Sequence, residues 1–505
     1  MALKGRPTKS NVRRPRAIAA ERLSISVSAD NDRPLFAQIR EQIRDYVFGG
    51  TLLPGMRLPP VRALAEQLGV NQVTVARAYR ELAEGKLIEG RHGGGSFVRV
   101  YQQRVPVDNL ANNVLPPLLA ERLFELSRAP GVIAFSSNYP AVDHLSLVEL
   151  RECLSIAASE KLDRCLHYDP PLGRPELRKQ IQIYLKKQGT NVDPDNVMVT
   201  SGGQQAIDLA VRALVEAGSP VVIEQPAYYG ALNAFRGARA RILEVPLEKD
   251  GMNLEILERH LVREKARVIY TNPTFQNPTG ITMSEAKRRA LLGLARRFGA
   301  VILEDDHSHE LRFSGKEICA IRALADENDL VLYARGFGKT FLHGMRVGYL
   351  VMPDALRQKL LTVKANVDLH SNSFIQEAVA LYLSRQNYVG ALKRIRKKYA
   401  PRQRLLYNSL KADMPAGTLV NLPEGGLSLW LTLPKGAEVS ELYFRAVRRG
   451  VAFVAGDVFY ASPSNPRSLR ISFGLNQAEE MEEGVSRLCS VVKDLLNHRG
   501  AAVGA

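Results

Sequence analysis

The stretch Val331–Tyr349, with the sequence VLYARGFGKTFLHGMRVGY, decides the fold of most of this chain. It opens with a β-branched, apolar run that predicts a buried strand. A turn with two glycines, Gly336 and Gly338, follows. Lys339 stands just past the turn, and Arg346 begins a second apolar strand. A lysine at the mouth of a buried sheet is poorly solvated, so its pKa falls and its amine becomes a better nucleophile toward an aldehyde.

Arg346 indicates which kind of aldehyde Lys339 would bind. The planar fork of an arginine is suited to gripping a phosphate. A lysine that forms an imine and an arginine that anchors a phosphate are what pyridoxal phosphate requires. A single lysine beside a turn is far more often a solvated surface residue, so the assignment of Lys339 depends on the other motifs of the chain.

Length and composition set the limits. A chain of 505 residues predicts two or three domains, and 45% hydrophobic with 24% charged residues is ordinary for soluble globular protein. The net charge of +17 favours a polyanionic partner, nucleic acid before an anionic membrane. No apolar run is long enough for a membrane helix and no secretory signal is visible, so we expect a cytoplasmic protein without a membrane partner. The four cysteines show no metal-binding spacing, so no metal site is expected: Cys153, Cys165, Cys319 and Cys489.

The N-terminal hundred residues divide into an arm and a compact unit. Residues 1–32 are basic and poor in large apolar groups, and predict a mostly disordered arm that either contacts DNA phosphates or is a solvated tail. Residues 33–100 begin with apolar residues at helical spacing, from Leu35 to Val47. A second helix is expected at 61–68 and a third at 72–84.

The third helix suggests a partner for this unit. Asn71 is suited to cap its N-terminus, and the second and third helices with their glycine-containing turn form a helix-turn-helix pattern. Residues 87–100 read as two short strands around a glycine-rich turn, which is a wing. Short polar groups on this helix suit base edges and arginines suit phosphates, although a polar helix face is often simply solvated. The exposed candidates are Gln72, Val73, Thr74, Arg77 and Arg80.

Residues 34–100 resemble a GntR-type winged helix. The resemblance is carried by LPPxR at 58–62, LA at 64–65, LGV at 68–70, TV at 74–75, AY at 78–79, Leu82 and GxGxFV at 93–98. It implies operator contacts by Arg62, Asn71, Gln72, Thr74, His92 and Gly93. The family usually shows Ser at the position of Pro60 and Ser-Arg at the positions of Asn71 and Gln72, so the operator sequence is expected to differ.

Beyond a linker at 101–133 with one short amphipathic helix at 115–127, strand and helix patterns alternate. This alternation predicts a mostly parallel sheet covered by helices over 134–495, followed by a tail at 496–505. From about 395 the pattern changes to a long basic helix, short strands and a final helix, which predicts a smaller α+β subdomain over 395–495. The strands are expected at 196–200, 220–224, 267–271, 300–305, 330–334 and 346–352.

Several motifs at strand ends fit the chemistry proposed for Lys339. The turn at 201–205 lets the amides of Gly202, Gly203 and Gln204 approach an anion at a helix N-terminus, although such a turn is commonly only structural. Asp305 ends a buried strand, where its carboxylate needs a partner such as a protonated pyridine nitrogen. A metal site or a helix-capping role is the alternative for this acid.

Three further side chains complete the predicted pocket. His307 is two residues from Asp305 and is placed to approach a ring hydroxyl. Asn277, in the turn at 275–280, offers an amide to a ring oxygen. Tyr228 follows another strand and is suited to stacking on a flat ring, although a tyrosine there is more often plain core.

Taken together, residues 134–495 resemble fold-type I aminotransferases of class I/II, and the whole chain resembles the MocR group of GntR regulators. The resemblance implies Lys339 as the imine lysine, Asp305 on the pyridine nitrogen, Asn277 on the ring oxygen and Tyr228 stacked on the ring. It places Arg346 and the amides of residues 202–204 on the phosphate, with Tyr168 reaching the phosphate from a second subunit. Arg470 matches the arginine that holds an amino-acid carboxylate; otherwise an arginine there is a surface residue.

The chain departs from the family at the phosphate site. Hydroxyl residues usually precede the lysine by one and three positions, where this chain has Gly338 and Gly336. His307 replaces a usual tyrosine, and Arg335 replaces a usual glycine. We expect weaker phosphate anchoring, with part of the lost interaction replaced by the charge of Arg335.

Three functions remain open from the sequence. The first is a homodimeric regulator that binds DNA and senses pyridoxal 5'-phosphate or an amino compound. The second is a working aminotransferase with a DNA-binding module. The third is a DNA-binding protein whose large domain is only a dimerisation scaffold, to which the two glycines lend some support. We favour the first and expect no physiological turnover.

Overall fold

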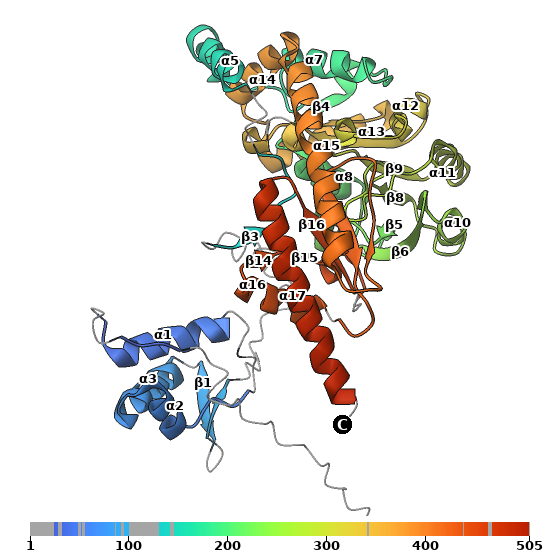
Figure 1. Ribbon diagram of the computed structural model, residues 1–505. Coiled ribbons are helices and arrows are strands. Elements are labelled where there is room, and N and C mark those ends of the chain that lie inside the picture. Colours follow the sequence, from blue (N-terminus) through green and yellow to red (C-terminus); the bar gives the residue numbers. More distant parts are fainter. Residues whose placement is uncertain are drawn as a thin grey trace, which may run out of the picture. The chain divides into compact units, whose positions relative to one another are not determined.

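The computed structural model separates the chain into two compact units, Met1–Asp108 and Asn109–Ala505 (Figure 1). It describes residues 25–28, 33–48, 52, 56–85, 87–91, 95–99, 131–141, 146–340, 343–437, 439–462 and 467–503. The predicted helix at 115–127 and the wing residues His92 and Gly93 lie outside these ranges. No helix of the described residues is both long enough and apolar enough to cross a membrane.

The small unit is a helix-turn-helix with a two-stranded wing. Its helices are α1 (Leu35–Phe48), α2 (Val61–Leu68) and α3 (Gln72–Glu84), and β1 (Ile88–Arg91) pairs antiparallel with β2 (Gly95–Val98). Gly69 ends α2 in the left-handed region at φ 63°, which a glycine adopts without strain. The side chain of Asn71 accepts a hydrogen bond from Val73 N at 2.9 Å and so caps α3, as predicted.

The predicted arm is partly folded. Ile25 is buried in the core of this unit, together with Ile39 and Ile43 of α1. Ser28 N donates to Gln38 Oε1 at 3.1 Å, and Gln38 Nε2 donates back to Ser28 O at 2.9 Å. Residues 25–28 of the predicted arm are held by these contacts, and the apolar side chains of Ile25 and Val27 pack with the core of this unit. The rest of the predicted arm lies outside the described residues.

The large unit is built on an eight-stranded sheet with the order β4-β11-β10-β9-β8-β5-β6-β7. Strands β10, β9, β8, β5 and β6 are parallel, and the pairings of β10 with β11, β11 with β4 and β6 with β7 are antiparallel. This confirms the predicted mostly parallel sheet. The bounds are β4 (Val197–Thr200), β5 (Pro220–Gln225), β6 (Arg241–Glu248), β7 (Gly251–Met252), β8 (Val268–Thr271), β9 (Val301–Asp305), β10 (Val331–Gly336) and β11 (Gly348–Val351).

Helices cover both faces of this sheet. Alternate residues of β5 enter different cores: Val221 and Ile223 pack with α8 and α9, whereas Val222 packs with α10 and α11. The corresponding helices are seen on opposite sides of the strands in Figure 1. The helix bounds are α5 (Leu147–Glu160), α6 (Leu162–Cys165), α7 (Pro175–Lys186), α8 (Gly203–Leu214), α9 (Tyr229–Gly237), α10 (Leu254–Arg263), α11 (Glu285–Phe298), α12 (Ile321–Leu324), α13 (Asp354–Asp368) and α14 (Ser373–Ser384).

A smaller α+β subdomain follows, as predicted. The long helix α15 (Asn387–Asp413) leads into an antiparallel sheet with the order β12-β13-β16-β15, and a separate strand β14 pairs with β3 from the start of the unit. Since Ile133 of β3 pairs with Val451, the end of the predicted linker belongs to this unit. The remaining bounds are β3 (Ile133–Ala134), β12 (Leu419–Val420), β13 (Ser428–Thr432), α16 (Val439–Arg448), β14 (Val451–Ala452), β15 (Val454–Ala455), β16 (Ser468–Ser472) and α17 (Ala478–Val503).

The ends of these elements differ from the predictions in two places. Helix α17 continues to Val503, past the predicted start of a tail at 496. Arg346 does not begin a strand; it lies two residues before β11, with a left-handed φ of 55°. This backbone conformation breaks the extended run and lets the Arg346 side chain leave the plane of the sheet.

Candidate functional site

A cavity of about 520 Å³ lies where the strands of the large sheet end. Asp305 is the last residue of β9, Gly336 is the last residue of β10, and Gly202 follows β4. Ligands of such sheets bind at the carboxyl ends of the strands. The cavity is lined by Tyr139, Gly202, Gly203, Gln204, Ile207, Tyr228, Asn277, Asp305, His307, Gly336, Gly338, Lys339, His343, Arg346 and Val347.

Lys339 reaches this cavity from a single turn of 3-10 helix, Phe337–Lys339, that follows β10. Its side chain is partly buried, and Nζ donates a hydrogen bond to the backbone oxygen of Asn138. Burial lowers the pKa of Lys339 to about 7, with a further contribution from the positive charge of Arg470, while Asp305 opposes the shift. A large fraction of the amine is therefore neutral and nucleophilic near neutral pH.

Asp305 faces the same cavity from the end of β9. Its side chain is 6% exposed, and Tyr270 Oη donates to Asp305 Oδ2 at 2.7 Å. Burial raises the pKa of Asp305 to about 7, against the effect of the Tyr270 hydrogen bond. A carboxylate held in this way is stabilised by a cationic partner, and a protonated ring nitrogen has the required charge.

Asn272 connects three of the predicted residues. Its Oδ1 accepts from Asn277 N at 2.6 Å, while its Nδ2 donates to the backbone oxygen of Asp305 and lies 3.0 Å from His307 Nδ1. Asn272 itself is buried, and its backbone N donates to Glu224 at 3.1 Å. One amide therefore fixes the positions of the turn at 275–280 and the end of β9 relative to each other.

Arg470 comes from the small subdomain and contacts Asn277, a residue of the cavity wall. It lies on β16 and is 2% exposed. Its Nη1 donates to Asn277 Oδ1 at 2.8 Å, and its Nη2 donates to the backbone oxygen of Ser136 at 3.0 Å. The guanidinium has no carboxylate partner among the described residues and is thus available to an anionic ligand.

The turn between β4 and α8 forms a cradle. Gly202 has a φ of 87°, and a Cβ there would lie 2.7 Å from Arg346 Nη2; a Cβ on Gly203 would lie 3.4 Å from Gly336 N. Arg346 is exposed, and its Nη2 donates to Ser201 O at 3.2 Å. Backbone amides at a helix N-terminus beside a guanidinium are suited to a phosphate. Gln204 Oε1 is buried without a protein hydrogen-bond partner beside this cradle.

Three predicted residues remain, and only two of them line the cavity. Tyr228 and His307 line the cavity, and the ring of Tyr228 lies 5.0 Å from that of Tyr229. Burial and the nearby Lys339 lower the pKa of His307 to about 3, so this imidazole is neutral at pH 7. Tyr168 does not line the cavity: it is 85% exposed, and its ring is 5.8 Å from that of His370.

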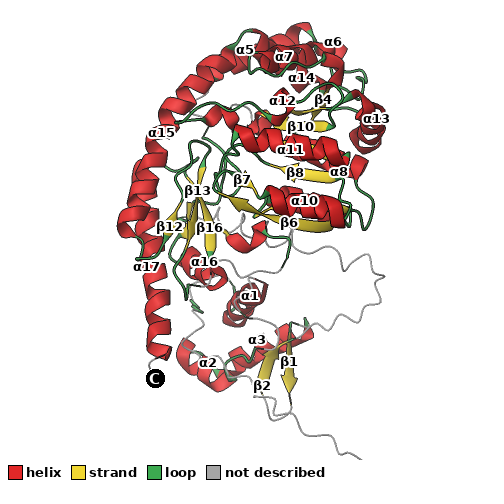
Figure 2. Cartoon of the chain, turned by 90° about the vertical axis from the view of Figure 1, so that its right-hand side faces the viewer, coloured by secondary structure: helices red, strands yellow, loops and turns green. Residues whose placement is uncertain are grey.

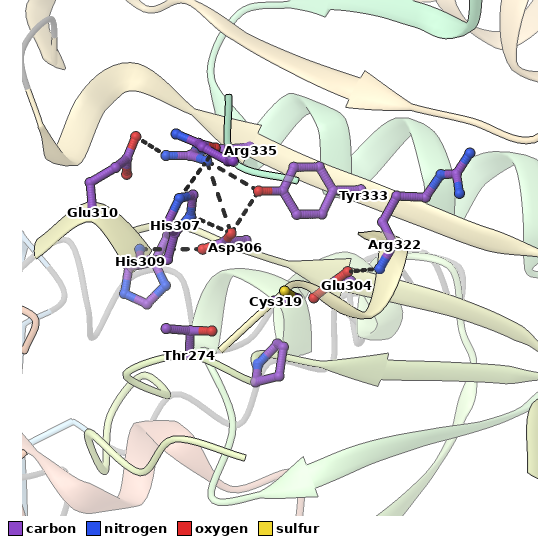
Figure 3. A network of polar contacts seen from close by, with 12 residues as sticks. Thr274, Glu304, Asp306, His307, His309, Glu310, Cys319, Arg322, Tyr333 and Arg335 are labelled. Carbon is purple, nitrogen blue, oxygen red and sulfur yellow. Dashed lines mark hydrogen bonds and ion pairs between the residues drawn. The ribbon is translucent and has the colours of Figure 1, made fainter. Parts of the chain in front are cut away.

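Arg335 does not serve the phosphate, so the expectation that its charge replaces the missing hydroxyls is wrong. The side chain is 1% exposed and pairs with Glu310 (Figure 3). It also donates to Tyr184 Oη at 3.1 Å. Side chains alternate between the faces of a strand. Gly336 borders the cavity, so Arg335 points to the opposite face, toward Asp306 at 4.0 Å.

The motifs of the sequence do not indicate several residues that line the cavity or contact its predicted residues: Asn138, Tyr139, Ile207, Tyr270, Asn272, His343 and Val347. Asn138 and Tyr139 come from an irregular segment without a periodic pattern, and the ring of Tyr139 lies 5.0 Å from that of His343. Only tertiary folding brings that segment to Lys339. Tyr270 and Asn272, by contrast, stand at the carboxyl end of β8, directly before the turn that holds Asn277. Their position at a strand end was a signal available in the sequence.

The predicted DNA-contacting residues in the described part of the small unit lie on α2 and α3. Arg62, Asn71, Gln72 and Arg77 are exposed, and Thr74 is partly exposed. Arg77 Nε lies 3.3 Å from Glu81 Oε1, and its guanidinium carbon is 3.7 Å from the ring centre of Phe36. These contacts hold Arg77 in an extended position on the surface of α3.

Comparison with known proteins decides the family. The model of aminotransferase class I and II matches residues 130–488, and the model of bacterial regulatory proteins of the gntR family matches residues 35–98. The chain belongs to the class I and II aminotransferase family. It also carries a GntR helix-turn-helix domain, the combination found in MocR-type regulators. Membership of this family indicates pyridoxal 5'-phosphate as the cofactor.

Relatives of both kinds are found. The chain is 29% identical over 470 residues to the probable rhizopine catabolism regulatory protein MocR of Rhizobium meliloti, which covers 91% of this chain and 94% of that protein. It is 34% identical over 377 residues to the 2-aminoadipate transaminase of Thermus thermophilus, covering 74% of this chain and 93% of the relative.

Solved structures agree with the fold of the large unit. The Thermus thermophilus α-aminoadipate aminotransferase LysN, complexed with N-(5'-phosphopyridoxyl)-L-leucine, superimposes with a TM-score of 0.71 at 34% identity over 77% of this chain and 97% of that one. The Pyrococcus horikoshii kynurenine aminotransferase gives a TM-score of 0.73 at 32% identity, over 77% of this chain and 97% of its own.

The cavity fits a pyridoxal 5'-phosphate molecule. A neutral amine, a buried carboxyl group and a glycine cradle beside a guanidinium border one space, as an aldehyde, a ring nitrogen and a phosphate demand. Gly336 and Gly338 offer the cradle no side-chain hydroxyls. A phosphate would therefore have fewer contacts here than the family usually supplies.

Proposed function

We propose that this protein is a DNA-binding transcriptional regulator whose large domain binds pyridoxal 5'-phosphate and responds to an amino compound. The observation that carries the proposal is that Lys339, Asp305 and Asn277 line one cavity, with Arg470 donating to Asn277, in a chain that also holds a winged helix. Four of the regulators to which the chain is similar align over more than nine-tenths of its length.

In this proposal the residues of the cavity contact different parts of the cofactor. Lys339 would condense with the aldehyde carbon with loss of water, Asp305 would pair with the ring nitrogen, and Asn277 and His307 would face the ring oxygen. Tyr228 stacks on the ring. The phosphate is held by Arg346 and the amides of residues 202–204, with Tyr168 of a second subunit. When bound, the cofactor supplies a carbonyl group that captures primary amines.

Arg470 makes an amino acid the natural class of amino compound. Its buried guanidinium donates to Asn277, which lines the cavity, and its Nε–H group is buried without a hydrogen-bond partner. A carboxylate there would form a charge-assisted bidentate pair. Because Asn277 accepts from the same guanidinium, the arrival of a carboxylate and the position of the cofactor ring are coupled through Arg470.

For DNA, the proposal assigns the operator contacts to the exposed side chains at the start of α3. Gln72 and Thr74 read base edges, and Arg62 and Arg77 contact phosphates, with Asn71, His92 and Gly93 beside them. A homodimer would present two winged helices to two half-sites. The proposal therefore requires two subunits both for the operator and for Tyr168 to reach the cofactor.

The Lys339→Ala variant tests this function. The wild-type protein, incubated with pyridoxal 5'-phosphate, is expected to develop the visible absorbance of a lysine imine, and the variant is not. DNA binding is then measured with and without a panel of amino acids. A wild type that shows no such band, or whose DNA affinity is unchanged by every amino acid in the panel, would contradict the proposal.

A working aminotransferase is the second candidate. The lowered pKa of Lys339 and the uncommitted Arg470 are features that turnover also needs. Single-turnover measurements with an amino acid, followed by a keto acid, separate the two functions. A regulator without turnover retains its imine with the amino acid and releases no keto acid.

A further inference from the structure

Helix α15 carries most of the excess positive charge of the large unit. Residues 109–505 contain 51 basic and 42 acidic residues, an excess of nine. The 27 residues of α15 contain eight Lys or Arg and one acid, Asp413, and so contribute seven of that nine. The basic character of this chain is therefore not confined to its DNA-binding unit.

Four of these basic residues form a line, which we call the α15 stripe: Lys393, Lys397, Arg404 and Lys411. They are separated by four, seven and seven positions, and all four are exposed. At 100° and 1.5 Å per residue, they lie within about 40° of one another around the helix axis and span about 27 Å along it. All four charges are of a single sign, and Pro401 lies within the helix between Lys397 and Arg404.

The stripe is not balanced by the protein. None of its four side chains forms a hydrogen bond or an ion pair with another described residue. Other arginines of α15 do have protein partners, since Arg396 donates to Glu310 O and Arg402 donates to Gln477. Like charges on one helix face destabilise the helix, so an uncompensated line of four has a cost that a polyanion would remove.

The apolar face of α15 is already used. Ile395, Tyr399, Leu406 and Leu410 are fully buried in the core of the small subdomain. Figure 2 shows α15 running along one side of the large unit. A membrane-surface helix would need this apolar face for the lipid. The stripe therefore fits a soluble, regularly charged partner better than a bilayer.

We propose that the α15 stripe is a second DNA-binding surface, which contacts the phosphate backbone without reading sequence. The inference rests on the proposed DNA-binding function. Duplex DNA carries a phosphate every 3.4 Å along each strand, so the ~27 Å of the stripe matches about eight base pairs. Three of the four side chains are lysines, which act toward phosphates as flexible point charges.

The test compares two quadruple variants of the full-length holoprotein. The stripe variant is K393Q/K397Q/R404Q/K411Q. The control variant is K179Q/K249Q/R263Q/K359Q, which removes three lysines and one arginine that are exposed, scattered over the large unit and without a described ion pair. Both variants lose the same charge. Equal visible absorbance with the cofactor and equal dimer fraction show that each is folded.

The measured quantity is the salt dependence of binding to a mixed-sequence 60-bp duplex. Each lost phosphate contact reduces the slope of log K against log salt by about 0.9. The stripe variant is expected to lose about 2–4 units of slope per bound protomer, whereas the control variant keeps the wild-type slope. Equal slopes for the two variants would overturn the proposal, as would a stripe variant that changes the dimer fraction instead of DNA binding.

Two further arms separate other outcomes. If phosphatidylserine vesicles bind the wild type but not the stripe variant while DNA binding is unchanged, the stripe is a membrane surface and the proposal fails. A Q72A/R77A variant, which removes contacts of the winged helix, distinguishes DNA binding by that unit from DNA binding by the stripe. If the wild type itself does not bind the duplex, the proposed function fails; if it binds and only the stripe effect is missing, the second surface alone is refuted.

Discussion

At Lys339, burial and neighbouring charge act on one amine in the same direction. Arg470 and Arg346 both disfavour its protonation, and the carboxyl of Asp305 only partly compensates. A lysine with an ordinary pKa would be almost fully protonated at neutral pH and would capture an aldehyde slowly. The cavity thus prepares the amine before any cofactor arrives.

This preparation predicts an unusual pH dependence. Only the neutral amine attacks the aldehyde, so the rate of cofactor capture should rise with pH through about 7 and level off above it, rather than rising toward 10. Replacing Arg470 by Met removes a positive charge and should move the midpoint upward. Stopped-flow absorbance across the pH range measures both. An identical midpoint in the two proteins would show that Arg470 does not act on this amine.

The two glycines before Lys339 make a matched pair of substitutions. A Cβ on Gly338 has its nearest contact at 3.5 Å, whereas a Cβ on Gly336 would lie 2.8 Å from the backbone N of Gly203. Gly338→Ser should therefore add a hydroxyl near the phosphate and tighten cofactor binding by about tenfold, the effect of one hydrogen bond to a charged group.

Gly336→Ser is the counterpart. It should weaken cofactor binding, because the cradle at Gly203 must move to admit the new side chain. Cofactor titrations followed by absorbance give both dissociation constants. Two serine variants with the same affinity would mean that the space around these glycines does not control phosphate binding.

At the scale of elements, side chains at the ends of β9 and β10 alternate between the cofactor cavity and a buried cluster of polar residues. Asp305 faces the cavity, and the next residue, Asp306, faces the buried cluster around Arg335 and His309 (Figure 3). Burial alone would raise the pKa of Asp306, but His309 and Arg335 outweigh it and hold the pKa below its usual range. Alternation along a strand thus gives adjacent acids opposite protonation behaviour.

The start of α3 combines two roles in Asn71, which two substitutions can separate. Asn71→Ala removes the hydrogen bond to Val73 N and should destabilise the winged helix by about 1 kcal/mol. Asn71→Asp keeps a capping oxygen and places negative charge at a helix N-terminus, so stability should be retained. Its carboxylate would repel DNA phosphates, however, and binding should fall.

Chemical denaturation and binding to the 60-bp duplex report the two roles independently. If Asn71→Asp bound DNA as well as the wild type, Asn71 would be a cap and not a DNA contact. An unchanged stability in Asn71→Ala would contradict the capping role.

The sequence predicts these elements well where the signal is local. The cap at Asn71, the strand carrying Asp305 and the turn before Lys339 follow from residue type and period. The sequence does not predict the role of a residue where that role depends on side-chain orientation or on packing between distant segments. The position of Arg335 in the chain predicts a phosphate contact. As the neighbour of Gly336 on a strand, however, it points its side chain to the opposite face. Asn138, which accepts from Lys339, comes from 201 positions away in an irregular segment.

At the scale of the whole molecule, two units that match different family models are joined in one chain. The winged helix has its own core, and the aminotransferase fold has several. For the large unit to regulate the small one, cofactor and amino compound must bind two states of the protein with different affinity. That requirement has a thermodynamic consequence which is independent of how the signal is transmitted.

Coupling between binding sites is reciprocal. If an amino acid changes the affinity for the operator by some factor, saturating DNA must change the affinity for that amino acid by the same factor, with about 5–150-fold being usual. We expect equal factors in the wild type, measured by DNA titration with and without the amino acid and by amino-acid titration with and without DNA. The protein freed of cofactor should give a factor of one in both directions while still binding DNA. Coupling that persists without the cofactor would mean that the amino compound is sensed independently of it, because the imine of the amino compound forms with the carbonyl group of the cofactor.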